Sequence, residues 1–133
     1  MAQARRGVLI DTSILIAHVR GRLFLRDLLQ DYDDAYISAF TLYEFEFGAN
    51  RARRTSDFAG IEAAFRPNVL TVGRAEADLA AQMNGALASR NRQIGPGDAI
   101  IAGTALNHGL ELMTLNIAEF RRIPDLVVIA PTP

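Results

Sequence analysis

The chain has 133 residues and is 50% hydrophobic, which provides the length and the apolar material for one domain with a buried core, spanning residues 1–133. It contains no cysteine, which excludes disulfides, a thiolate nucleophile and sulfur-ligated zinc, so any bound metal must take oxygen or imidazole ligands. The net charge of −1 argues against a protein that coats nucleic acid through overall positive charge, so any such recognition would have to be local.

Short apolar runs alternate with longer amphipathic segments along the chain, a pattern typical of βαβ units around a parallel sheet. We expect strands at residues 8–10, 35–37, 68–71, 112–115 and 127–129. Helices are expected from about residue 13 and over residues 22–30, 38–49, 56–65, 75–90 and 98–108, the last closed by Gly109. The sequence therefore predicts an α/β fold with a central parallel sheet of about five short strands.

The first candidate site residue, Asp11, follows the apolar run Val8-Leu9-Ile10 and precedes Thr12-Ser13, a pair that commonly begins a helix. A strand is therefore expected to end at Asp11. Ligands of open parallel sheets bind beyond the carboxyl ends of the strands, where Asp11 would lie. An Asx turn or a helix cap is the structural alternative for a single Asp in this position.

The predicted helix 38–49 carries two acids, Glu44 and Glu46, and only one of them can contribute to a site shared with Asp11. The two lie about 200° apart around the helix axis. Glu44 falls beside Phe40 and Phe47 and is partly shielded, but the helix is apolar on two sides, so periodicity leaves the choice open. One apolar side would suit a subunit interface, and a solvated surface charge is the alternative for either Glu.

The third acid, Asp98, follows Gly95-Pro96-Gly97 and begins the predicted helix 98–108. On the same helix face lie Ile101, Ala102 and Ala105, small apolar residues of the kind that pack against a sheet. Asp98 therefore begins a buried face. Helix capping or compensation of the helix dipole would explain it without any function.

Together, Asp11, Glu44 and Asp98 are placed to converge on one crevice, with Asn116 at the end of a further strand. If the three carboxylates came within about 5 Å, each pair would cost roughly 3 kcal/mol at an effective dielectric near 20. A bound divalent cation would remove that penalty. Carboxylate and amide oxygens favour Mg²⁺ or Mn²⁺ over zinc or copper.

Four ordered motifs resemble those of PIN-domain ribonucleases, and most closely those of VapC-type toxins from bacterial toxin–antitoxin pairs. They are Leu9 to Ser13, Tyr43 to Gly48, Gly97 to Ala102, and Met113 to Phe120. The resemblance covers the chain from Val8 to Ile129. It implies a PIN-like three-layer α/β/α fold and a catalytic set of Asp11, Glu44, Asp98 and Asn116, of which the first three bind the metal. It also favours Glu44 over Glu46.

The fourth position of the site departs from the commonest family pattern, because this chain has Asn116 where the family often has Asp. A neutral amide is a weaker metal ligand and would instead hold a metal-bound water or orient the substrate. Thr114, at the end of the same predicted strand, is placed to hydrogen-bond a neighbouring acid. Glu119 could supply the missing charge, but we expect it to be a surface residue.

The resemblance implies a Mg²⁺- or Mn²⁺-dependent endoribonuclease that hydrolyses RNA phosphodiesters and leaves a 5′-phosphate and a 3′-hydroxyl. It also implies tRNA or ribosomal RNA as targets, a cognate antitoxin bound over the acidic groove, and a homodimer. The apolar segments 40–47 and 58–65 fit either kind of interface. The alternative, left open by Asn116, is a non-catalytic PIN-like module that binds RNA or protein.

Other chemistries are less well supported by the residues present. The two histidines, His18 and His108, lie near predicted helix ends without an acidic partner at useful spacing, and we expect them to be surface or capping residues. A P-loop nucleotidase is excluded because the chain has no lysine. No run approaches the roughly 18 apolar residues that span a bilayer, so we expect a cytoplasmic protein without membrane association.

Overall fold

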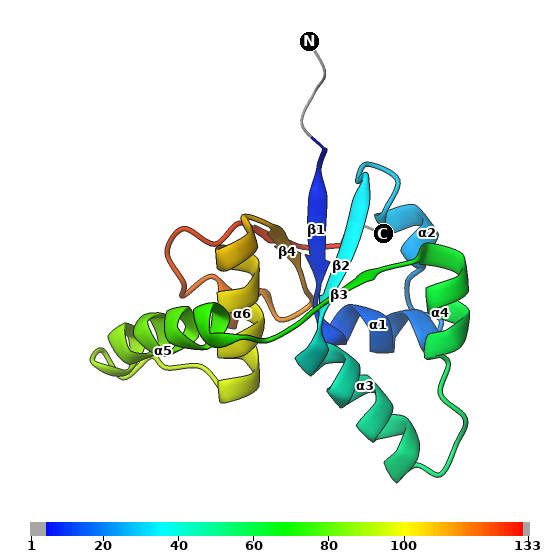
Figure 1. Ribbon diagram of the computed structural model, residues 1–133, viewed down its shortest axis with the longest axis horizontal. Coiled ribbons are helices and arrows are strands. Elements are labelled where there is room, and N and C mark those ends of the chain that lie inside the picture. The colour runs from blue at the N-terminus through cyan, green and yellow to red at the C-terminus, as the bar shows by residue number, and fades with distance from the viewer. Residues whose placement is uncertain (1–4, 132–133) are drawn as a thin grey trace.

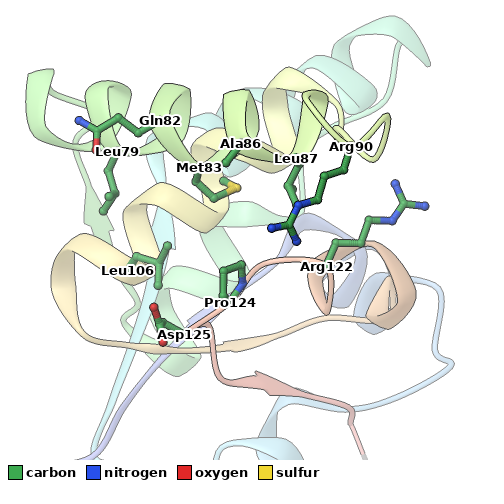
Figure 2. Close-up of a pocket in the computed structure, with 10 residues that line it drawn as sticks. All are labelled: Leu79, Gln82, Met83, Ala86, Leu87, Arg90, Leu106, Arg122, Pro124 and Asp125. Atoms are coloured by element: carbon green, nitrogen blue, oxygen red, sulfur yellow. The ribbon is translucent and has the colours of Figure 1, made fainter.

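A parallel sheet of five strands lies at the centre of the computed structural model, which describes residues 5–131 (Figure 1). The strands are β1 (Gly7–Ile10), β2 (Asp34–Ser38), β3 (Asn68–Leu70), β4 (Glu111–Met113) and β5 (Val128–Ile129). Their order is β3-β2-β1-β4-β5, and every neighbouring pair is parallel. The predicted five-stranded parallel sheet is therefore confirmed.

Helices connect the strands, as the alternating pattern predicts. They are α1 (Thr12–Val19), α2 (Leu25–Leu28), α3 (Ala39–Arg51), α4 (Phe58–Phe65), α5 (Arg74–Ala88), α6 (Pro96–His108) and α7 (Ile117–Phe120). The helix expected over 22–30 is only the single turn α2, and the turn α7 was not predicted. Within residues 5–131, no helix is long and apolar enough to cross a membrane.

Two boundaries near the candidate acids differ from the prediction for local physical reasons. Helix α6 begins at Pro96 and not at Asp98, because proline is accepted in the first turn, where no intrahelical hydrogen bond is lost. Gly109 ends the same helix in the left-handed conformation, as expected. Strand β4 ends at Met113 and not at Leu115 as predicted. The backbone N–H of Leu115 donates to the Ser13 hydroxyl and not to a neighbouring strand.

Side chains from the two faces of the sheet enter two separate cores, which makes the fold a three-layer α/β/α arrangement. Val8 and Ile10 of β1 point into one core, beneath α1, α2 and α4, while Leu9 points into the other, beneath α5 and α6 (Figure 1). All three side chains are at most 1% exposed. Burial on both faces explains why β1 is a continuous apolar run.

Helix α6, which carries Asp98, packs closely against α5 at Gly103. A Cβ atom added there would lie 2.7 Å from the backbone oxygen of Glu76 and 3.0 Å from the Ala80 Cβ. We therefore expect Gly103→Ala to lower the free energy of unfolding by about 1–3 kcal/mol, because backbone has to move.

The matched control for this substitution is Gly85→Ala on α5, where an added Cβ meets nothing within 4 Å. The control should raise stability by about 0.5–1 kcal/mol through helix propensity. Urea unfolding of both variants measures the difference. Equal stability of the two variants would show that α5 and α6 do not pack as described.

Candidate active site

Asp11 immediately follows β1 and is 4% exposed. It occupies the position before α1, but its side chain makes no capping hydrogen bond. Its Oδ2 atom instead accepts hydrogen bonds from the hydroxyls of Ser13 and Thr114, each at 2.7 Å. No hydrogen bond among the described residues uses Oδ1, so this oxygen is left for another ligand. The structure thus excludes helix capping as the explanation for Asp11.

Glu44 lies half-buried on α3 and is held by the first turn of α1. Thr12 Oγ1 lies 2.7 Å from Glu44 Oε1 and 3.1 Å from the hydroxyl of Thr41. Glu46 lies on another side of α3, where its carboxylate accepts a hydrogen bond from Ser56. The predicted separation of the two glutamates is confirmed, and Glu44 is the one that faces the end of β1.

Asp98 lies half-buried in the first turn of α6. Burial raises the pKa of its carboxyl group to about 7, and a hydrogen bond with the Glu119 carboxyl group adds to this shift. The negative charges of Asp11 and Glu44 contribute further to the raised pKa. Asp98 therefore lies within electrostatic reach of both other predicted acids, so the three segments do meet at one place.

The turn between β4 and α7 completes the site and corrects one expectation. The exposed Asn116 donates from Nδ2 to Glu119 Oε2 at 2.9 Å, and its backbone N–H donates to Thr114 Oγ1, also at 2.9 Å. The expectation that Glu119 is a surface residue is wrong, since it is half-buried and its carboxyl group raises the pKa of Asp98. Its i, i+3 spacing from Asn116 was the available signal, but it needed the unpredicted turn α7.

The donor chemistry of this site fits a hard divalent cation, because it combines four carboxylates with one amide oxygen and no sulfur or imidazole. Burial is the main cause of the raised pKa of Asp98, and the neighbouring negative charges add a repulsion that a cation would relieve. Among residues 5–131, however, no three acidic or histidine side chains are drawn together tightly enough to enclose an ion. The carboxylates gather without forming a closed coordination sphere.

Both histidines are engaged elsewhere. His18 Nδ1 accepts the backbone N–H of Leu25 at 3.2 Å and so caps α2, and burial lowers the pKa of its ring. His108 Nε2 lies 3.3 Å from Glu76 Oε1, so the expectation that it has no acidic partner is wrong. The two residues are 32 positions apart in the chain, so their contact could not be predicted from local sequence spacing. Neither ring takes part in the acidic site described above.

Comparison with known proteins finds one family model and several relatives that match most of this chain. The model of the PIN domain family matches residues 8–126. Ribonuclease VapC1 of Rickettsia felis is 36% identical over 130 residues, covering 92% of this chain and 95% of the relative. The tRNA(fMet)-specific endonuclease VapC of Shigella flexneri is 35% identical over 92 residues, covering 68% and 70%.

Among solved structures, that of DNA-bound VapBC from Salmonella typhimurium superimposes with a TM-score of 0.82 at 28% identity, covering 96% of this chain and 99% of that one. The segment matched by the family model contains the whole candidate site, from Asp11 to Glu119. The fold that carries the site is thus that of the VapBC structure.

Proposed function

This chain belongs to the PIN domain family and, within it, to the VapC ribonucleases; from that premise we propose that it is a Mg²⁺- or Mn²⁺-dependent endoribonuclease. It cleaves RNA phosphodiester bonds and acts as the toxin of a toxin–antitoxin pair. The Shigella flexneri relative is named for tRNA, and we propose tRNA or another structured RNA as the substrate here.

One observation supports the metal-dependent reaction above all others. Asp98 lies within electrostatic reach of three other carboxylates, those of Asp11, Glu44 and Glu119, which come from separate segments near the ends of the first and fourth strands. Folding gains nothing from bringing like charges together, and strongly perturbed pKa values are most often found at functional sites. A role in binding a cation and a phosphate accounts for the arrangement.

Within this proposal, Asp11, Glu44 and Asp98 hold the Mg²⁺ or Mn²⁺ ion. When bound, the ion would activate a water molecule and offset the negative charge that develops on the scissile phosphate. The hydroxyls of Ser13 and Thr114 orient Asp11, and that of Thr12 orients Glu44. Such supporting hydrogen bonds keep ligands in one rotamer and so keep the site organised.

We assign Asn116 and Glu119 to the part of the site formed by the turn between β4 and α7. The Asn116 amide is exposed and is held by its hydrogen bond to Glu119, so it can orient a water molecule or a phosphate oxygen of the substrate. Glu119 contributes the negative charge that Asn116 lacks. The hydrolysis leaves a 5′-phosphate and a 3′-hydroxyl.

Cleavage of purified RNA tests this function directly. With Mg²⁺ or Mn²⁺ the protein is expected to cut at least one RNA of a panel that includes tRNA and ribosomal RNA, and EDTA should stop the reaction. Added Mn²⁺ should restore it, and the products should carry a 5′-phosphate. RNA that is bound but not cut with any divalent metal would favour the non-catalytic binding module.

The proposed partners are a cognate antitoxin, since the structures of relatives are those of VapBC proteins, and a second copy of the chain. The antitoxin is proposed to cover the acidic groove, and a cleft of about 390 Å³ beside α4, lined by Ile61, Phe65 and His18 among others, offers it a further surface. Expression of the chain alone should arrest growth, and co-expression of a small adjacent reading frame should relieve the arrest. If expression of the chain alone does not slow growth, the toxin role is contradicted, while the ribonuclease activity is unaffected by that result.

A further inference from the structure

Three aromatic side chains on α3 form a row beside Glu44, and we call Phe40, Tyr43 and Phe47 the aromatic row. The ring centroids of Phe40 and Tyr43 are 6.1 Å apart, and the rings of Tyr43 and Phe47 are stacked at 5.8 Å. Tyr43 is 60% exposed and Phe47 is 51% exposed. We infer that this row binds unpaired RNA nucleotides by base stacking and so selects single-stranded segments, an inference that rests on the proposed ribonuclease function.

The inner end of the row touches the acidic site. The Phe40 ring packs directly over Gly97, so closely that a Cβ atom there would overlap it, and Gly97 precedes Asp98. Positions 40, 43, 44 and 47 share one side of the helix. From Phe40 to Phe47 the row extends about 10 Å along the helix axis. A base stacked on the row is therefore held next to the carboxylates that act on its backbone.

A shallow cleft of about 490 Å³ runs along the outer side of the row and combines apolar walls with polar groups. Tyr43 and Phe47 form part of its wall, and Glu46 and Asn50 contribute polar atoms. Asn50 donates from Nδ2 to the backbone oxygen of Glu46 at 2.8 Å, which fixes the orientation of its amide. Flat apolar walls with hydrogen-bonding groups at the edge match the chemistry of a nucleobase.

Positively charged residues follow the aromatic row at the C-terminal end of α3. Arg51 lies one turn after Phe47 at the end of α3, and Arg53 and Arg54 follow it. All three are exposed, and none forms an ion pair with another described residue. Arginine forms bidentate hydrogen bonds with phosphate groups. Proteins that bind single-stranded nucleic acid combine such basic residues, which contact the backbone, with aromatic side chains on which the bases stack.

A second copy of the chain fits this surface less well than RNA. Tyr43 and Phe47 alone, at 60% and 51% exposure, offer roughly 250 Å² of aromatic surface, which is only part of the ~800 Å² that each partner contributes to a stable interface. The adjoining acidic site and basic residues instead suit a polyanion that passes from one to the other.

A single tryptophan reports base stacking directly, because the natural chain has none. Phe47→Trp in EDTA, which prevents cleavage, is titrated with a 12-nucleotide oligouridine and with an abasic oligomer of equal length. We expect only the oligouridine to quench the emission. The matched control is Phe24→Trp, at a 56% exposed aromatic next to α2, which should not respond. Equal quenching by both oligomers would overturn the stacking role.

Kinetics give the second test. Tyr43→Ala with Phe47→Ala should raise the KM for single-stranded RNA at least tenfold and leave kcat within about twofold, because stacking is lost equally from ground and transition states. Phe24→Ala should change neither constant. A double variant that keeps its KM but sediments as a smaller species than the wild type would assign the row to a second copy.

Failure of this inference is distinguishable from failure of the proposed function. If the wild-type protein cuts RNA and the double variant cuts it equally well, the RNA-binding role of the aromatic row is ruled out, while the ribonuclease function stands. Base-dependent quenching of Phe47→Trp, together with wild-type protein that never cuts RNA, would rule out the nuclease and keep the row as a binding surface. No quenching and no cutting overturns both.

Discussion

Replacing Asp98 by Asn is expected to abolish RNA cleavage and, at the same time, to stabilise the metal-free protein. Activity should fall by roughly 10³-fold, because one of the three proposed metal ligands loses its charge. Stability should rise because the raised pKa of Asp98 means that the folded protein disfavours the carboxylate. The side chain is half-buried, so solvent screening limits the gain to about 1 kcal/mol at pH 8.

The same raised pKa predicts a pH dependence of the wild-type protein in the absence of metal. In the unfolded chain an Asp loses its proton near pH 4, whereas folded Asp98 has a pKa of about 7. Between these values the folded state binds more protons than the unfolded state, so the contribution of Asp98 to stability falls as the pH rises. Above pH 7 this group causes no further change, and the Asp98→Asn variant should lack the fall altogether.

Urea unfolding in EDTA at pH 5 and pH 8, together with RNA cleavage in Mn²⁺, measures both halves of the prediction. Asp31→Asn is the matched control, since Asp31 is exposed and lies outside the acidic site, and it should change neither quantity. Undiminished RNA cleavage by the Asp98→Asn variant would contradict a catalytic role for Asp98. An Asp98→Asn protein that unfolds more easily at pH 8 would contradict the described environment of this carboxyl group.

Thr114→Val is expected to weaken metal binding and activity by about 10- to 100-fold without removing any ligand. Thr114 is fully buried, and its hydroxyl donates to Asp11 Oδ2 at 2.7 Å while accepting the backbone N–H of Asn116. Valine keeps the shape of the side chain but removes both hydrogen bonds. Asp11 would then be held by Ser13 alone, and the turn to Asn116 would lose its anchor.

The control for this substitution is Thr104→Val on α6, which is equally buried and loses a hydrogen bond to the Ile100 backbone oxygen. It should change stability by a similar amount and leave activity unaltered. The deciding measurement is the Mn²⁺ concentration at half-maximal cleavage, which should rise for Thr114→Val alone. An equal response of both variants would mean that Thr114 contributes only to general stability.

Local patterns in the sequence determined the fold and most of the site. The continuous apolar run of Val8 to Ile10 predicted a strand buried on both faces, and parallel strands place their carboxyl ends on one edge of the sheet. This geometry predicted that Asp11 and Asn116 lie near one another, and helix periodicity separated Glu44 from Glu46. These inferences depend on residues close in the chain, where sterics and burial act locally.

Only the tertiary structure decided which side chains support and complete the site. Glu119 reaches Asp98 because the turn α7 folds it back, and Thr12 holds Glu44 across 32 residues. Such contacts depend on side-chain rotamers and on how α1, α3 and α6 pack around the sheet. Hydrophobic spacing carries no information about the direction of a hydroxyl or a carboxylate. The sequence by itself therefore determined where the acids lie along the fold, whereas packing determined what surrounds each of them.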